Sequence, residues 1–295
     1  MKIKNVFRKL KRDDTFSGFL FLLPSLCGVS LFFIIPFIGG LYYAVVDSPI
    51  NGHFVGLKNF SDLLQNDAFL KASTNTMLFT ILCVPLNICI SLVLALMLNK
   101  FTKKDNIFRM LFISPLVIPV ASVAFFWQMI FDNNGTLNYF LYTCGIASSD
   151  WMKTGWARVV IIIIYLWKNI GYNVVLYLSA LSNVPVEYYE SADIDGARGY
   201  QKFFSITFIY LTPSSFFVFI ISIINSFKVF RETYLIAGQY PHESIYLLQH
   251  YMNNMFISLD YQKLTSAAYM MAAAITILVF ILFNYQKKIS SYFTQ

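Results

Sequence analysis

The sequence has little charge and few cysteines. Asp, Glu, Lys and Arg make up 13% of its 295 residues, against roughly 25% in an ordinary soluble domain. Apolar residues make up 57% of the chain, and so little charge cannot keep them away from water. Three of the four cysteines, Cys27, Cys83 and Cys89, lie within apolar runs, and the set indicates no disulfide framework. The composition therefore excludes both an ordinary soluble domain and a small disulfide-rich one.

Several chemical motifs are also missing. No G-x-x-x-x-G-K-[ST] phosphate loop occurs, so the chain lacks the usual means of binding ATP by itself. No Ser, His and Asp set suggests catalysis within a membrane. His242 and His250 are eight residues apart with no cysteine or carboxylate cluster nearby, which does not fit a metal site. We expect no enzyme activity, no metal and no cofactor bound by this chain.

Long apolar runs are what the sequence has instead. A helix that crosses a hydrocarbon layer of ~30 Å needs about 20 apolar residues. Six runs are long enough, at 17–46, 73–99, 107–131, 157–181, 207–230 and 266–286. The first is too long for a signal peptide, and Pro24 and Pro36 are places where it can kink. The sequence therefore predicts an all-α membrane protein with six transmembrane helices in one domain, 17–286.

Basic residues predict the orientation. The net charge of +7 gathers at the ends of apolar runs, which is typical of membrane topology and not of nucleic-acid binding. Fourteen Lys and Arg fall on one side, in 1–16, near 100–109, in 182–206 and in 287–295. The opposite loops, near 47–72, 132–156 and 231–265, and the span ends beside them hold seven over longer segments. We expect a multi-pass protein of the bacterial cytoplasmic membrane whose basic N-terminus (1–16) and tail (287–295) are both cytoplasmic.

The predicted cytoplasmic loop 182–206 differs from a short polar linker. Its first part suits a helix start, with potential caps, a proline and early acidic residues: Ser182, Asn183, Pro185, Glu187 and Glu190. Gly196 is expected to end or turn this helix, and a second short segment, 197–204, would lead into the next span. The pattern predicts a helix, turn, helix element with acidic and aromatic groups available to a partner.

The spacing within this loop resembles the permease components of binding-protein-dependent ABC importers. Their motif reads E-A-A, three residues, G, nine residues, then I-x-L-P. Here Glu190, Ser191, Ala192, Gly196 and Ile206 fall at the matching places. An incidental amphipathic loop is the alternative, and it leaves this spacing unexplained.

Three positions depart from the motif. Ser191 stands for an alanine, Phe208 for the leucine and Ile209 for the proline. Pro213, four residues later, is expected to supply the break that Ile209 does not. Pro185 and the run 194–197, Ile-Asp-Gly-Ala, resemble the carbohydrate subfamily of maltose, glycerol-phosphate and multiple-sugar permeases. The basic N-terminus and long first span resemble its maltose-F-type or lactose-F-type subunit.

The resemblance implies the transmembrane domain of a type I ABC importer. The loop would form coupling helices that sit in a groove of a separate ATPase subunit, which uses ATP and Mg. Glu190 would meet a basic residue there and Gly196 would permit the turn. The coupling residues implied are Glu190, Ser191, Ala192, Asp195, Gly196 and Ala197. The implied partners are a second, related permease in a heterodimer, two ATPase subunits, an extracytoplasmic sugar-binding protein and membrane lipid.

Polar residues inside the spans are the candidates for a substrate path, because they are costly in lipid. The set is Lys168, Asn169 and Asn173 in the fourth span, with Asn225 and Ser226 in the fifth. Amide and ammonium groups beside aromatic rings suit the hydroxyls and C–H face of a sugar. Alternatively, Lys168 snorkels to the outer interface and the amides join helices.

Two other functions compete with the importer. An ion-coupled secondary transporter needs carboxylates within its spans, whereas all fifteen Asp and Glu are expected in loops or at span ends. A membrane assembly or scaffold protein leaves the loop motif unexplained. The outer loop 231–265, rich in tyrosine and histidine, is expected to form part of an outer gate and of the surface on which the binding protein docks.

Overall fold

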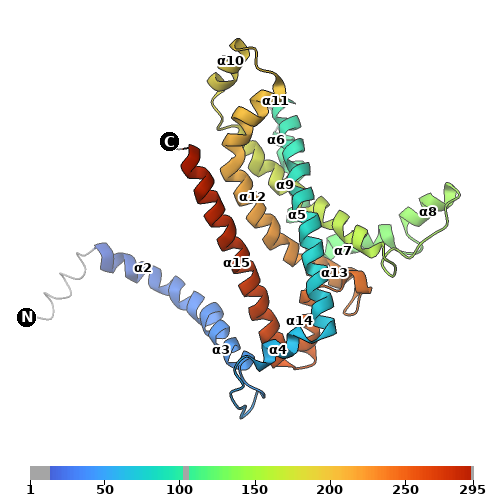
Figure 1. The fold of residues 1–295 in the computed structure, drawn as a ribbon. Helices are drawn as coiled ribbons and strands as arrows, with labels where there is room; N and C mark the ends of the chain where they lie inside the picture. The colour runs from blue at the N-terminus through green and yellow to red at the C-terminus, as the bar shows by residue number, and fades with distance from the viewer. Residues whose placement is uncertain (1–13, 102–105, 294–295) are drawn as a thin grey trace, which may run out of the picture. The chain divides into compact units, whose positions relative to one another are not determined.

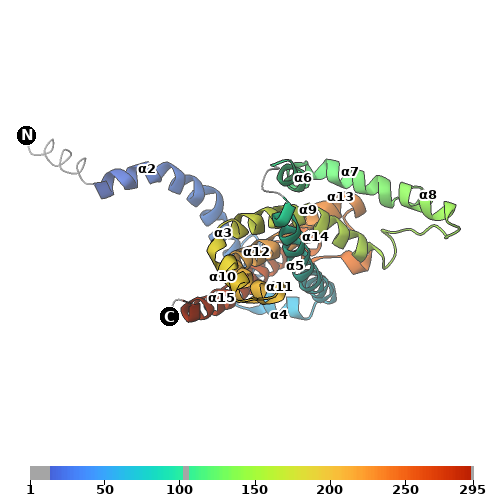
Figure 2. The ribbon, with the colours of Figure 1, turned by 90° about the horizontal axis from the view of Figure 1, so that it is seen from above.

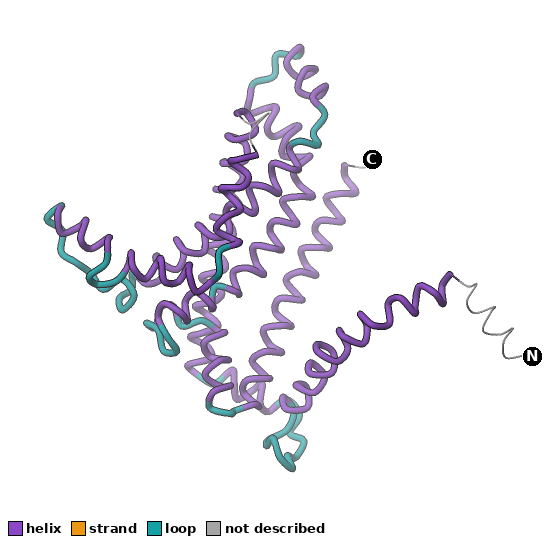
Figure 3. The backbone as a smooth tube through the Cα atoms, turned by 180° about the vertical axis from the view of Figure 1, so that it is seen from behind, coloured by secondary structure: helices purple, strands orange, loops and turns teal. Residues whose placement is uncertain are grey.

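The computed structural model describes residues 14–101 and 106–293, which are mostly helical and contain no β-strand (Figure 3). The helices in chain order are α2 (Asp14–Val29), the π-helix η1 (Ser30–Ile34), α3 (Ile35–Ala44), α4 (Lys58–Leu64), α5 (Asp67–Phe101), α6 (Asn106–Val117), α7 (Val120–Phe131), α8 (Thr136–Thr143), α9 (Ala157–Leu181), α10 (Val186–Ile194), α11 (Gly199–Lys202), the π-helix η2 (Phe203–Thr207), α12 (Phe208–Lys228), α13 (Phe230–Ala237), the 3₁₀-helix η3 (Glu243–Ile245), α14 (Leu248–Ile257) and α15 (Tyr261–Phe293). The described residues form two compact units, one made of those within the ranges 1–65 and 255–271 and the other of those within 66–254 and 272–295.

The second unit is a helical bundle around α9. Helices α5, α6 and α12 each pack on α9, and α5 also packs on α12. One core cluster surrounds Trp127 and Tyr165, and another surrounds Val174 and Tyr177. Figure 1 shows α10 at one end of this bundle and α13 at the other. Helix α9 therefore connects the end of the unit near α13 with the end near α10.

The described residues contain five helices long and apolar enough to cross a membrane, or six if one bent pair counts as a span. That pair is the third predicted span, and a single helix over 107–131 is wrong. Helix α6 ends at Val117 and α7 starts at Val120, with a bend of 98° between them. Pro119 causes the break, because it offers no N–H and forces the preceding residue out of the helical conformation. Figure 2 shows α7 continuing toward α8.

The other predicted spans match helices with shifted ends. Helix α9 has the predicted bounds, 157–181. Helix α5 starts at Asp67, six residues early, because Asn66 Oδ1 accepts a hydrogen bond from the N–H of Phe69 at 2.9 Å and caps it. The kink expected at Pro36 appears as η1, where the Ile35 N–H donates to the Ser30 carbonyl. A π-turn of this kind accommodates a proline without ending the helix.

The first unit joins α3 to the start of α15. The Asn59 side-chain amide donates to the carbonyls of Ala44 and Val46, at 3.0 and 2.8 Å. The Tyr269 hydroxyl donates to the Phe37 carbonyl, and a Cβ on Gly40 would lie 3.3 Å from that hydroxyl. Gly40 therefore permits the close approach of the tyrosine.

Candidate functional site

Residues 182–206 begin with the short helix α10, as the sequence predicts. Pro185 is the N-cap of α10, with φ −60° and ψ 134°, so the helix starts one residue after the proline. The expected caps are not used: no side chain caps α10, and the Ser182 hydroxyl donates instead to the Ser179 carbonyl at 2.8 Å. The helix start is thus set by the fixed backbone of the proline.

The turn after α10 needs a glycine. Gly196 has a φ of +75°, a conformation that costs other residues about 1–2 kcal/mol. Its N–H donates to the Asp193 carbonyl at 3.1 Å, and the Ala197 N–H donates to the Ala192 carbonyl at 2.9 Å. These two bonds form a Schellman motif, which satisfies the last carbonyls of the helix.

The segment after the turn is not a separate short helix as expected for 197–204. Helix α11 runs directly into η2 and α12. The Phe208 N–H donates to the Phe203 carbonyl, five residues back. Nor does Pro213 supply a break, because α12 continues through it to Lys228. One helical path therefore leads from the turn to Lys228.

Two side-chain contacts fasten α10 to this path. Lys202 forms an ion pair with Asp193, and the hydroxyls of Tyr189 and Thr207 lie 2.8 Å apart. No residue of α10 is buried, and Ile194 at its end is 88% exposed. Of the six coupling residues implied by the resemblance, four are exposed and two are half-buried: Glu190, Ser191, Asp195 and Gly196, then Ala192 and Ala197. Helix α10 is anchored on one side and open on the other.

A cavity of about 290 Å³ lies between α6 and α7, α9, and the junction of α12 with α13. Three of the five predicted path residues line it, namely Lys168, Asn169 and Asn225. The other two do not: the Asn173 amide donates to the Ser222 hydroxyl at 2.9 Å, and the Ser226 hydroxyl lies 2.9 Å from that of Thr80. These two contacts join neighbouring helices.

Sequence reasoning missed the main charged partner in this cavity. The loop expected from residue 231 starts with a helix instead, α13, and Glu232 on it is 3% exposed. Its Oε1 accepts from Lys168 Nζ, so this lysine is paired rather than snorkelling. Its Oε2 is buried and has no hydrogen-bond partner within the described residues. The sequence did contain a signal that helix continues beyond α12. Val229, which is buried, and Ile236 are seven residues apart, the spacing of two apolar residues on one helix face.

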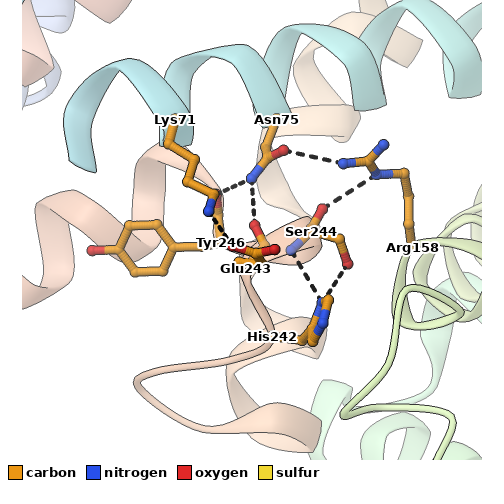
Figure 4. Close-up of polar contacts among 7 residues, drawn as sticks. All are labelled: Lys71, Asn75, Arg158, His242, Glu243, Ser244 and Tyr246. Carbon is orange, nitrogen blue, oxygen red and sulfur yellow. Dashed lines mark hydrogen bonds and ion pairs between the residues drawn. The ribbon is translucent and has the colours of Figure 1, made fainter. Parts of the chain in front are cut away.

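The connection from α13 to α14 forms polar contacts with two spans, α5 and α9 (Figure 4). Lys71 of α5 forms an ion pair with Glu243. The Asn75 amide donates to the carbonyls of Glu243 and Tyr246, at 2.7 and 3.1 Å. Arg158 of α9 donates to Asn75 Oδ1 at 3.2 Å and to a backbone carbonyl of the same connection. The hydrogen bond and charge of Lys71 lower the pKa of Glu243.

The two histidines of this region have separate surroundings. His242 is half-buried, and its Nδ1 lies 2.9 Å from the Ser244 hydroxyl. His250 is buried, and its Nδ1 accepts from the Leu247 N–H at 3.3 Å. Burial lowers the pKa of His250 to about 4, because the charged form cannot be solvated. His250 is therefore a neutral core residue at ordinary pH.

The sequence is similar to those of several known permease proteins. The chain is 30% identical over 298 residues to the probable ABC transporter permease protein YesP of Bacillus subtilis, covering 95% of this chain and 92% of that protein. It is 34% identical to the arabinooligosaccharides transport system permease protein AraP of Halalkalibacterium halodurans, covering 69% and 68%. It is 30% identical to the sn-glycerol-3-phosphate transport system permease protein UgpA of Yersinia pestis, covering 71% and 72%.

A solved structure shares the fold. It is a chain from the crystal structure of a bacterial ABC transporter involved in the import of the acidic polysaccharide alginate, with a TM-score of 0.83 at 22% identity, covering 96% of this chain and 99% of that one. Residues 87–291, more than half of the sequence, match a family described as binding-protein-dependent transport system inner membrane component. The match includes α10, the turn at Gly196 and the cavity residues. This multi-pass membrane protein belongs to the family of binding-protein-dependent transport system inner membrane components.

Proposed function

We propose that this chain is a permease subunit of an ATP-driven sugar importer and that α10 couples it to a separate ATPase. The observation that carries the proposal is the motif at Glu190 to Ile206, whose spacing corresponds to an exposed helix and a glycine turn. Relatives at 30–34% identity are named as permeases for arabinooligosaccharides and sn-glycerol-3-phosphate, which supports a carbohydrate or carbohydrate-like cargo.

The proposed partners follow from the same reading. An ATPase subunit would receive α10 in a groove, with Glu190 against a basic residue and the exposed Ile194 against an apolar one. A second permease of the same family would complete the translocation path, and each permease would hold one ATPase. Both termini and α10 would then be cytoplasmic, as the distribution of basic residues predicts.

The transmission of motion would use the contacts that fasten α10. Lys202 and Thr207 hold α10 to the start of the helical path that continues through α12, and α13 follows with Glu232 in the cavity. A displacement of α10 by the closing ATPase would therefore tilt α12 and change the cavity walls. An extracytoplasmic sugar-binding protein would deliver cargo at the opposite end, against the connection that Glu243 ties to α5.

The test is gentle purification of the tagged chain from its native membranes, followed by identification of co-purifying proteins. We expect an ATPase and a second permease with the unaltered chain, and loss of the ATPase with Glu190→Lys or Gly196→Asp. Glu187→Lys, a charge reversal on the same helix outside the motif, is the matched control and should retain the ATPase. A chain that purifies alone in every case would overturn the proposal.

Ion-coupled transport is the second candidate function, and one observation favours it. Glu232 is a buried carboxylate beside a membrane cavity, whereas the sequence predicted none. Its buried ion pair with Lys168 opposes a role as a free proton carrier, because one carboxylate oxygen is already held by a cation. Uptake that persists when a protonophore collapses the gradient while ATP is maintained would exclude this candidate.

A further inference from the structure

We propose that the cavity between α9 and α13 binds a carbohydrate that carries an anionic group, either a carboxylate or a phosphate. The inference rests on the proposed importer function and names the class of its cargo. Four charged side chains line the cavity, and three of them are cations: Lys168, Lys228, Arg231 and Glu232. The lining therefore has a net charge of two positive units.

The two excess cations are available to a ligand. Lys168 is neutralised by Glu232, with which it forms the buried ion pair. Lys228 and Arg231 form no ion pair with any carboxylate of the described residues, and both are exposed. Much of the remaining wall is apolar, including Leu116, Ile118 and Val120. Apolar walls lower the local dielectric constant and strengthen the attraction of these cations for an anion.

Other groups in the cavity suit hydroxyls. Asn169 Nδ2 donates a hydrogen bond to the Tyr165 carbonyl at 2.8 Å, and the amide oxygen of Asn169 remains available as an acceptor. Asn225 supplies a second amide to the lining. The buried Oε2 of Glu232 has no partner within the described residues, and a buried acceptor left unpaired is costly. A hydroxyl of a bound sugar, reached by a small shift of the side chain, would satisfy it.

A neutral sugar fits this lining less well. Neutral sugars are held mainly by aromatic rings that stack on their C–H faces, and Tyr165 is the one aromatic residue among the lining residues. The combination of two unpaired cations with amide and carboxylate acceptors points to a ligand that has both a negative group and hydroxyls.

The experiment measures ATP-dependent uptake in cells in which the native copy is replaced by each variant. The labelled probes are trigalacturonate, glucose 6-phosphate and the neutral sugar maltotriose, so that the first two separate a carboxylate from a phosphate. We expect uptake of at least one anionic probe in preference to maltotriose. Lys228→Gln/Arg231→Gln should raise the KM for that probe at least tenfold, and co-purification of the ATPase should be unchanged.

The matched control removes two cations elsewhere. Lys58→Gln/Lys153→Gln changes the net charge equally outside the cavity and should leave the KM unchanged. Preferred uptake of maltotriose, an equal effect of both double variants, or no uptake of either anionic probe while the ATPase still co-purifies would overturn the anionic class and leave the importer function standing. Absence of the ATPase would overturn the importer function itself.

Discussion

Helices α9 and α10 follow one another in the chain and have opposite surroundings. Helix α9 buries twelve residues, including the polar Asn169 and Asn173, whereas α10 buries none. The amides of those two asparagines are hydrogen-bonded inside the unit. By contrast, α10 exposes the acidic and apolar side chains near its end. Packing within this chain therefore determines α9, while α10 has a surface that no described residue covers.

Each helix also depends on one glycine, for different reasons. A Cβ on Gly171 of α9 would lie 1.5 Å from the carbonyl oxygen of Phe112 on α6, so this glycine permits two backbones to touch. Nothing lies within 4 Å of a Cβ on Gly196, which is needed for its positive φ. The first glycine serves helix packing and the second serves a turn.

The largest expected effect comes from breaking the buried ion pair of α9. Lys168→Met leaves Glu232 charged and buried, and removing one partner of such a pair costs about 3–5 kcal/mol. Thermal unfolding of the purified protein should show a large fall in Tm. Adding Glu232→Leu to this variant should recover most of it. Lys202→Met removes the more exposed ion pair of α10, which contributes about 1 kcal/mol or less, so its Tm should fall much less. Equal falls in Tm for Lys168→Met and Lys202→Met would contradict the comparison.

Gly171→Ala tests the helix contact. The overlap with the Phe112 carbonyl forces α6 away from α9, and overpacking of this kind costs about 1–3 kcal/mol. We expect a lower Tm and a reduced yield of monodisperse protein. Gly28→Ala is the control, because a Cβ at this helical glycine meets nothing within 4 Å. A Tm equal to that of the unaltered protein would show that α6 does not need the close contact.

The comparison also shows what could be predicted from the sequence. Apolar runs predicted the existence of the long helices and the bounds of α9, and the motif spacing predicted α10 and its glycine turn, because these depend on local composition. The break at Pro119 was missed, although proline was a usable signal. The continuation of helix past residue 230 was missed because Arg231 and Glu232 look like the start of a polar loop.

Partners in space could not be predicted. Nothing in the spacing of Lys168 and Glu232, 64 residues apart, indicates an ion pair. Nor does the sequence distinguish Asn169, which lines the cavity, from Asn173, which joins α9 to α12. The two residues are one helical turn apart, and the neighbouring helices decide which of them meets open space.

Gly196→Ala should have a smaller and more local effect than Gly171→Ala. An alanine at a φ of +75° costs about 1–2 kcal/mol. This cost should destabilise only the turn and the end of α10, because a Cβ at position 196 contacts no other part of the protein. Hydrogen exchange should accelerate at the amides of Gly196 and Ala197, whose bonds close the turn. Exchange in α9 should be unchanged. A loss of protection throughout α9 would mean that α10 supports the bundle.

The smallest effect on unfolding should come from Ile194→Ser. The side chain is 88% exposed, so its removal should change the free energy of unfolding by no more than about 0.5 kcal/mol. If the ATPase covers this side chain, however, the complex loses the burial of an isoleucine, worth about 1.5–3 kcal/mol. Binding to the ATPase should then weaken by at least about tenfold. Leu259→Ser, at a residue that is 64% exposed and outside the coupling segment, should change neither quantity. An ATPase affinity unaffected by Ile194→Ser would mean that the exposed end of α10 is not the covered surface.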